Sequence, residues 1–283
     1  MQKVIPVDRA KHGLKCLMEG YYSLVLKLRT PLKCILVLAH MRSGSSLLVH
    51  LLSSNPDICG FGETHIDYRT KHDLSRLSYW VLYKLRRFPL PGRETYVLDK
   101  IVHNSHLRTD DLPILCARDV KVIFLIRDPR GALRSLMESL NYDSHRAVRY
   151  YCDRLSTLAR HARYLAGSGS CALITYEDML SRTEDVFGLL EHYLELEHPL
   201  SEQYRLLRTT GAAGTGDFSA KLFSGQICRD EGRLTLPPME AGLSREAVEV
   251  FQSCLRTMAR CCITAHEGSG HRDATSSDTE LTL

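Results

Sequence analysis

Short apolar runs alternate along the chain with longer stretches in which apolar residues recur at helical spacing. Three runs rich in strand-forming residues are CILVLAH at 34–40, KVIFLI at 121–126 and CALITY at 171–176, and TYVLDKIV at 95–102 is a weaker fourth. Continuous apolar character over such short lengths is typical of strands buried on both faces, as in a parallel sheet. The pattern therefore predicts a buried parallel sheet built from these segments.

Three of the helical stretches have clear apolar stripes. One is leucine-rich, spans residues 47–52 and ends at the sequence SSNP, and the others span 148–162 and 247–262. Ser244 is the expected N-cap of the last helix, because a serine hydroxyl can accept a hydrogen bond from an amide of the first turn. Strands that alternate with helices predict an α/β fold in which helices cover both faces of a central parallel sheet.

The length of 283 residues suits one large domain, and 44% apolar and 25% charged residues are ordinary values for a globular protein. We expect a single domain over residues 1–264. Residues 69–93 form a basic insertion with the chain's only tryptophan, and we consider it a candidate lid for an acceptor site, although basic helix faces are more often simply solvated. Residues 265–283 are polar and rich in Ser, Thr and Asp, which predicts disorder.

Charge and cysteine usage exclude several classes of protein. The formal net charge of +4 is too mild to indicate a nucleic-acid partner, which would need a concentrated basic surface. No stretch approaches the roughly 20 apolar residues of a membrane span, and residues 1–20 lack the pattern of a secretory signal. None of the ten cysteines forms a C-x-x-C pair. We therefore expect a reduced, cytoplasmic protein without a metal, a membrane span or a nucleic-acid partner, and the sequence does not indicate its oligomeric state.

The sequence AHMRSGSSLLVHLL at 39–52 joins the first predicted strand to a helix. Free backbone amides and the helix dipole favour an anion at such a junction, and Gly44 lets the backbone approach it closely. Arg42 adds a permanent charge with a planar fork of donors. Hydroxyl donors come from three further residues: Ser43, Ser45 and Ser46. The stretch is therefore a candidate phosphate-binding loop, with an ordinary strand–helix turn as the alternative.

The same loop lacks the Walker pattern G-x-x-x-x-G-K-[ST], since no lysine follows Gly44. The sequence also contains no clear magnesium-binding motif. Both observations argue against a nucleoside-triphosphate kinase.

A second stretch, KVIFLIRDPRGALRSLMESL at 121–140, again joins a buried strand to a helix. Arg127 stands where the strand ends, and Asp128 and Pro129 are expected to end the strand and begin the helix. Ser135 lies eight residues after Arg127, on the second turn of that helix. Arg127 and Ser135 could therefore grip one phosphate from two sides. The alternative is a surface arginine–aspartate pair and a solvent-facing serine.

These motifs resemble those of the sulfotransferases that use 3'-phosphoadenylyl sulfate (PAPS). RSGSSLL looks like the family's 5'-phosphosulfate loop, LIRDPRGALRS like its 3'-phosphate signature, and LITYEDML at 173–180 like its Tyr-Glu-Asp segment. The three occur in the family's order and anchor residues 34 to about 195. The residues in these motifs match the carbohydrate-type and bacterial sulfotransferases more closely than the cytosolic phenol and steroid enzymes. The resemblance implies a P-loop-like fold and a PAPS-dependent sulfotransferase that needs no metal.

The resemblance also implies roles for residues around the transferred group. Arg42 stands where cytosolic members carry a lysine that assists the leaving group, and because arginine stays ionised we assign it electrostatic stabilisation only. Glu63 follows an Asn-Pro-Asp stretch, as a glutamate does in the carbohydrate enzymes, and is the first choice for the general base. His65 is the fallback, and a solvated loop carboxylate is the alternative for Glu63.

Lys100 and His103 lie at the end of the weaker strand prediction. The family often has a lysine here, followed in cytosolic members by a histidine two residues later, but this chain has Val102 at that position. We assign Lys100 to the sulfate or the bridging oxygen. Because side chains alternate along a strand, His103 would face away from the site unless the strand has already ended.

Two residues are candidates for the nucleotide. Tyr176 begins the Tyr-Glu-Asp segment and is assigned to adenosine, with a core tyrosine as the alternative. Lys221 lies in the glycine-rich segment 211–227, which either folds over the nucleotide or is a linker. The acceptor is expected to be a small molecule or a glycan that offers a hydroxyl or an amine. A non-catalytic protein that binds 3'-phosphoadenosine phosphate (PAP) is the alternative function.

Overall fold

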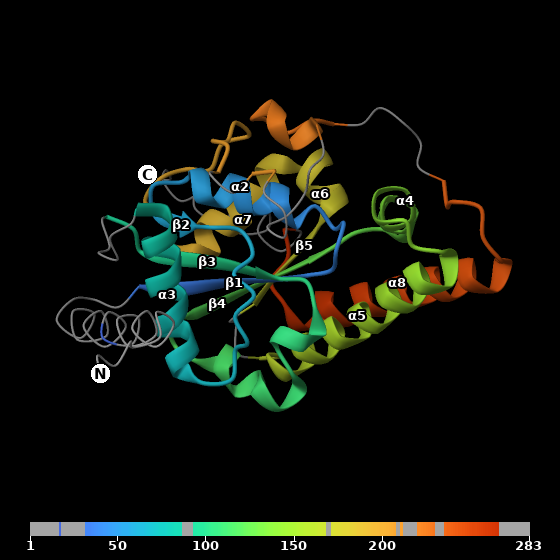
Figure 1. Ribbon diagram of the computed structural model, residues 1–283, viewed down its shortest axis with the longest axis horizontal. Coiled ribbons are helices and arrows are strands. Elements are labelled where there is room, and N and C mark those ends of the chain that lie inside the picture. The colour runs from blue at the N-terminus through green and yellow to red at the C-terminus, as the bar shows by residue number, and fades with distance from the viewer. Residues whose placement is uncertain are drawn as a thin grey trace, which may run out of the picture.

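A parallel sheet forms the centre of the computed structural model, which describes residues 17, 32–86, 93–167, 171–207, 210–211, 220–229 and 235–265 (Figure 1). Within these residues the strands are β1 (Lys33–Ala39), β2 (Ile58–Gly60), β3 (Tyr96–Ile101), β4 (Val120–Ile126) and β5 (Cys171–Thr175). Their order across the sheet is β2-β3-β1-β4-β5, and every neighbouring pair is parallel. The predicted α/β fold with a central parallel sheet is confirmed, and the weaker run at 95–102 is a fully buried strand.

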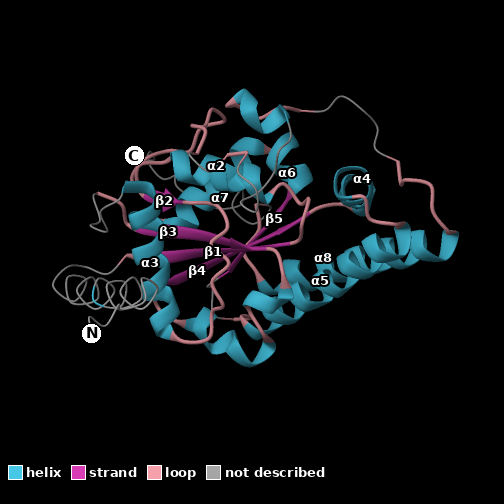
Figure 2. Ribbon diagram, in the orientation of Figure 1, coloured by secondary structure: helices cyan, strands magenta, loops and turns pink. Residues whose placement is uncertain are grey.

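Helices connect the strands and cover the sheet (Figure 2). In chain order they are α2 (Ser45–Ser54), α3 (Lys71–Arg86), α4 (Pro129–Leu140), α5 (Ser144–Tyr164), α6 (Tyr176–Ser181), α7 (Thr183–Leu194) and α8 (Ala241–Cys261). Shorter 3₁₀ turns are η1 (Asn104–His106), η2 (Thr109–Cys116) and η3 (Ala220–Ser224).

The two faces of the sheet bury two separate apolar clusters. Leu36 and Leu38 of β1 belong to the cluster with α3, α4, α5 and α8, whereas Ile35 and Val37 belong to the cluster with α2 and α7. This alternation follows from the period of two along a strand, and it requires that both faces be apolar. Figure 1 shows α2 and α7 on one side of the strands and α5 and α8 on the other. Helices on both faces of the sheet are therefore confirmed.

The register of the sheet aligns the carboxyl ends of its three central strands. Leu38 pairs with Ile101 of β3, and Ala39 pairs with Leu125 of β4. The segments that follow these strands consequently start next to one another at one edge of the sheet. Ligands of open parallel sheets bind at this edge.

The helix over residues 247–262 begins earlier than predicted. Helix α8 starts at Ala241, Glu240 occupies the N-cap position, and the amide of Ser244 donates to the Glu240 carbonyl. The expectation that Ser244 caps the helix is therefore wrong. Leu243 explains the difference, because it lies one turn before Ala247 and extends the apolar stripe that packs on the core.

The segment predicted as a basic insertion contains helix α3. Leu77, Val81 and Leu82 of this helix are completely buried in the cluster that covers β1 and β3. One face of α3 thus belongs to the main core, and whether its other face covers an acceptor stays a prediction. The predicted disordered tail lies outside the described residues, apart from its first residue. None of the described helices is both long enough and apolar enough to cross a membrane.

Candidate active site

The loop between β1 and α2 bends through two residues in the left-handed backbone region. Arg42 has φ 63° and Gly44, at the N-cap position of α2, has φ 87°. A Cβ at position 44 would lie only 2.6 Å from Cε2 of Tyr176, so glycine is required both by the backbone conformation and by the aromatic ring above it. No described side chain caps the first turn of α2. Its amides are therefore available to an anion.

Three residues predicted to bind phosphate groups converge on this loop. The Arg42 Nε donates to Ser135 Oγ at 2.7 Å, and the Arg127 Nη1 donates to the Arg42 carbonyl at 3.2 Å. Arg127 also stacks on Tyr176, with its Cζ 4.1 Å from the ring centroid. The ends of β1, β4 and β5 thereby meet in one cluster of donors and cations.

Helix α4 begins as the sequence predicts. Asp128 is its N-cap and accepts from the amide of Arg130, while Pro129 occupies the first turn. Gly131 follows, and a Cβ there would lie 2.6 Å from the Arg127 Nε. The glycine thus leaves room for the guanidinium of Arg127 against the start of α4, a relation that the linear motif does not reveal.

His40 links the donor loop to the end of β4 through a hydrogen bond. The sequence pattern placed it only within a predicted strand and did not indicate this role. It is completely buried, and its Nε2 accepts the amide proton of Arg127 at 3.0 Å. The Nδ1 lies 2.8 Å from the Met41 carbonyl and must carry the proton, because Nε2 is an acceptor. Burial lowers the pKa of His40 to about 4, which keeps the ring neutral at physiological pH.

Glu63 and Lys100 line a cavity of about 220 Å³ on the other side of the loop. The Lys100 Nζ donates to Ser46 Oγ at 3.1 Å and lies 3.6 Å from Glu63 Oε2. Lys100 is 4% exposed and Glu63 is 9% exposed, so this ion pair is largely withdrawn from water. Arg42 lines the same cavity. The candidate base and the candidate sulfate ligand therefore lie together beside the phosphate loop.

Asp99 supports the segment that carries Glu63 and was also missed from sequence. Its carboxylate accepts from the amide and hydroxyl of Thr64, at 2.9 and 2.5 Å, and from the hydroxyl of Tyr68 at 2.7 Å. Burial raises the pKa of the Asp99 carboxyl, and these hydrogen bonds oppose the rise. The sequence did contain a sign of this role, because an acidic residue inside an apolar strand, directly before Lys100, needs buried hydrogen-bond donors.

His103 and His65 line the same cavity as Glu63. Strand β3 ends at Ile101, so the alternation that would have turned His103 away no longer applies. Burial lowers the pKa of His103, and the nearby Glu63 carboxylate opposes that shift. His65 Nδ1 lies 3.6 Å from Glu63 Oε1. All three candidate bases therefore share one cavity.

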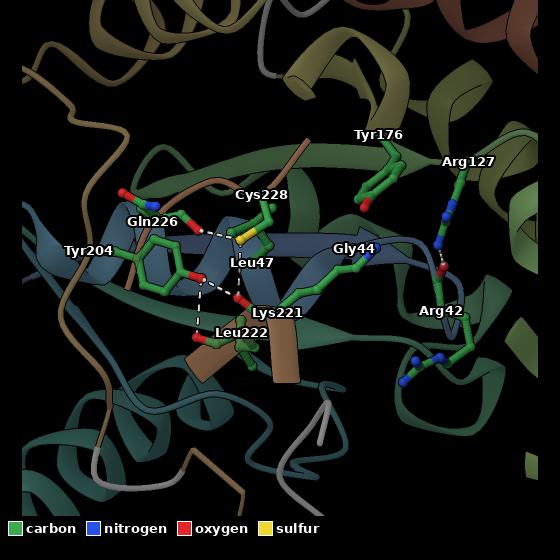
Figure 3. A pocket seen from close by; sticks show the side chains of 10 residues that line it. All are labelled: Arg42, Gly44, Leu47, Arg127, Tyr176, Tyr204, Lys221, Leu222, Gln226 and Cys228. Atoms are coloured by element: carbon green, nitrogen blue, oxygen red, sulfur yellow. Dashed lines mark hydrogen bonds between the residues drawn. The ribbon is translucent and has the colours of Figure 1, made fainter. Parts of the chain in front are cut away.

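A second, smaller cavity lies on the far side of Arg42, with Arg127 and Tyr176 in its wall (Figure 3). Lys221 also lines it, and Figure 3 shows its side chain extending toward Gly44. Lys221 belongs to η3, whereas residues 212–219 of the predicted glycine-rich segment lie outside the described residues.

The family profile described as the sulfotransferase domain matches residues 32–208. The chain belongs to the sulfotransferase family. Similar solved structures include the sulfotransferase domain from the curacin biosynthetic pathway, with 15% identity and a TM-score of 0.48, over 79% of this chain and 98% of that one. The sulfotransferase domain of the Synechococcus PCC 7002 olefin synthase has 18% identity and a TM-score of 0.48, over 78% and 94%. Mouse sulfotransferase SULT7A1, solved in complex with PAP, has 14% identity and a TM-score of 0.43, over 84% and 88%. A search of curated protein sequences finds no significant match.

In this sulfotransferase each strand delivers a predicted site residue at or just after its carboxyl end. These residues are Arg42 after β1, Glu63 after β2, Lys100 and His103 at the end of β3, Arg127 after β4 and Tyr176 after β5. The remaining residues predicted to bind phosphate groups lie on the loop, on α2 and on α4: Ser43, Gly44, Ser45, Ser46 and Ser135. The site is thus assembled at a single edge of the sheet.

Proposed function

We propose that the chain transfers the sulfuryl group of PAPS to a hydroxyl or amine of a small molecule or glycan. The observation that carries this proposal is the contact of Arg42 with both Ser135 and the Arg127 side chain, next to an uncapped helix start. Two permanent positive charges beside a helix start that has no side-chain cap suit a ligand with two separate phosphate groups.

A buried donor at the smaller cavity supports an anionic ligand. The Arg127 Nε is buried without a hydrogen-bond partner among the described residues, and Arg127 lines that cavity. Leaving such a group unpaired costs about 1–3 kcal/mol, and oxygen atoms of a phosphate would offset that cost. In the proposal the loop Arg42 to Ser46 binds the 5'-phosphosulfate, and Arg127 with Ser135 binds the 3'-phosphate.

The nucleoside is assigned to the smaller cavity. Tyr176 presents a ring there, and Lys221 supplies a further positive charge at its rim. This extends the sequence-based assignment of Tyr176 and favours the proposal that the segment around Lys221 folds over the nucleotide.

The transfer step needs a base and a means of stabilising the leaving group. The acceptor oxygen or nitrogen attacks the sulfur, the bond between the sulfur and the 5'-phosphate oxygen breaks, and the acceptor proton passes to Glu63. Charge that develops on the leaving oxygen is stabilised by Arg42 and Lys100, which are fixed in place before the reaction. Lys100 suits this position, because it contacts both Ser46 of the loop and Glu63.

A non-catalytic protein that binds PAP is the alternative, and the acceptor-side cavity argues against it. A binder has no need for a carboxylate, a lysine and two histidines around a space next to the 5'-phosphosulfate loop. These residues are expected in a protein that moves a proton.

The test combines binding and transfer. Calorimetry should detect PAP binding without added magnesium, and ³⁵S-labelled PAPS should label acceptors in a panel of sugars, phenols, alcohols and amines. Magnesium-dependent ATP binding with no PAP binding would contradict the proposal. PAP binding with no labelled product from any acceptor would favour the non-catalytic alternative.

A further inference from the structure

Helix α5 crosses the carboxyl ends of the central strands and contacts the backbone of the site through its polar side chains. The Tyr150 hydroxyl accepts the amide proton of Met41 at 2.7 Å and donates to the Val102 carbonyl at 2.9 Å. One oxygen atom therefore bridges the segment after β1 and the segment after β3. Burial raises the pKa of Tyr150 to about 12, so the hydroxyl keeps its proton and both hydrogen bonds at physiological pH.

Arg154 reinforces this bridge one turn later on the same helix. Its guanidinium donates to the Ala39 carbonyl at 2.8 Å, to the Ile101 carbonyl at 2.6 Å and to Asn104 Oδ1 at 2.7 Å. The side chain is 1% exposed, and these three acceptors are neutral oxygens of β1, β3 and η1. A buried arginine arranged in this way fixes strand ends against each other rather than pairing with a carboxylate.

The bridge lies directly beside the acceptor-side cavity. Met41 and Val102 line that cavity, and they immediately precede Arg42 and His103. The rings of Tyr150 and His103 are also neighbours, with centroids 6.3 Å apart. A shift of either bridged segment would therefore change the space between the phosphate loop and the candidate bases.

We propose that Tyr150 is a positioning residue for the transfer step, and that its hydroxyl sets the spacing across the acceptor cavity between the donor loop and the segment that carries His103. This inference rests on the proposed sulfuryl transfer. Tyr150 does not itself line the cavity. It holds two backbones whose next residues line the cavity, so its loss should lower turnover more than donor binding.

The neighbouring Tyr151 provides an internal comparison. Its hydroxyl donates to the Arg127 carbonyl at 2.6 Å, and its ring packs edge-on against His40 at a centroid distance of 5.0 Å. Tyr151 therefore supports the donor side, whereas Tyr150 joins the donor loop to the acceptor side. A third tyrosine, Tyr193, makes the same type of bond pair with the backbone of Val122 near the amino end of β4, away from the site.

The experiment removes one hydroxyl at a time, in Tyr150→Phe, Tyr151→Phe and Tyr193→Phe. Tyr150→Phe should lower kcat roughly ten- to a hundredfold, since small misplacements of reacting groups have effects of that size, and should leave the PAP dissociation constant within about twofold. Tyr151→Phe should weaken PAP binding by roughly three- to tenfold through Arg127. Tyr193→Phe should lower the melting temperature and leave the kinetics of the folded enzyme unchanged.

A second variant tests the link between α5 and the segment after β3 by removing the partner of Arg154 in η1. Asn104 is exposed, so Asn104→Ala should fold, and it should lower kcat by roughly three- to tenfold with PAP binding kept, because Arg154 loses its contact to η1. A parental kcat in folded Tyr150→Phe or in Asn104→Ala would overturn the inference, as would equal losses of kcat and PAP affinity. Failure of the proposed function would appear differently, as PAP binding without transfer in the parent chain.

Discussion

The proposed donor side and the proposed acceptor side of the site are built in different ways. The donor side consists of Arg42–Ser46, Arg127, Ser135 and Tyr176. Arg42 donates to Ser135, and Arg127 donates to the Arg42 carbonyl and stacks on Tyr176. The acceptor side consists of Glu63, Lys100 and His103, whose titratable side chains line one cavity. Permanent charge and backbone amides suit binding over a wide pH range, whereas titratable groups suit proton transfer. Substitutions on the two sides should therefore separate affinity from turnover.

The largest expected effect is on the acceptor side. Glu63→Gln keeps the side-chain shape and removes the proton acceptor, so kcat should fall by about two to four decades while PAP affinity stays near the parental value. Steady-state transfer of ³⁵S from PAPS and calorimetry with PAP measure the two quantities in the same preparation.

Turnover near the parental rate in Glu63→Gln would transfer the role of base to His65 or His103. A histidine acts as a base only when neutral, so the rate would then fall on acidification. Because burial lowers the pKa of His103, its acidic limb would lie below the usual value of 6.5.

The next effect in size concerns the donor side. Arg127→Ala removes charge-assisted contacts worth roughly 1.5–3 kcal/mol, so PAP should bind about one to two decades more weakly. The loss should be much smaller for adenosine 5'-phosphosulfate, which lacks the 3'-phosphate. Equal losses for PAPS and adenosine 5'-phosphosulfate would refute the assignment of Arg127 to the 3'-phosphate.

Buried histidines should make stability depend on pH. His40, beneath the donor loop, and His161, in the core, are fully buried, and burial lowers the pKa of each to about 4. Each contributes stability that is complete above pH 6.5 and is lost as the pH falls toward 4, because only the unfolded chain then binds the proton. The free energy of unfolding should drop by on the order of 2 kcal/mol per histidine between pH 7.5 and 5.0.

Urea denaturation at the two pH values measures this drop. His161 has no hydrogen-bond partner among the described residues, so His161→Phe should make the drop smaller by on the order of 2 kcal/mol and leave PAP binding intact. An unchanged pH dependence in His161→Phe would show that His161 binds a proton as readily in the folded chain as in the unfolded chain.

The smallest effect comes from a glycine on the donor side. In Gly131→Ala the new Cβ would lie 2.6 Å from the Arg127 Nε, so the guanidinium must move, and PAP affinity should fall roughly three- to tenfold. Gly242→Ala is the matched control, since it also lies in the first turn of a helix and nothing lies within 4 Å of its added Cβ. Both variants should gain up to about 1 kcal/mol of helix propensity. Equal PAP affinity in the two variants would show that Arg127 does not depend on this space.

The polar residues of α5 show where sequence-based prediction stopped. The apolar stripe over 148–162 predicted the helix, but a tyrosine and an arginine beside such a stripe have the same sequence pattern whether they face water or a strand end. Only the packing of α5 across β1 and β3 gives Tyr150 and Arg154 their backbone partners. His40 and Asp99 were missed for the same reason, since each lies within an apolar run and bonds to a segment distant in sequence.

The sequence by itself determined the α/β class, the donor-side motifs and the strands β1, β3, β4 and β5, whereas the short strand β2 was not predicted. A strand, a turn and a helix that follow one another in the chain build a phosphate site from their own backbone, so residues 39–52 and 121–140 carry the necessary information locally. The tertiary structure decided how the two donor-side motifs meet, at the contacts of Arg42 with Ser135 and Arg127, and it decided the acceptor side. Glu63 and Lys100 lie within 3.6 Å because β2 and β3 pair in parallel, and His103 joins them because β3 ends at Ile101. Strand pairing brings carboxyl ends together whatever their separation along the chain, and the local sequence of a strand does not specify which strand it pairs with.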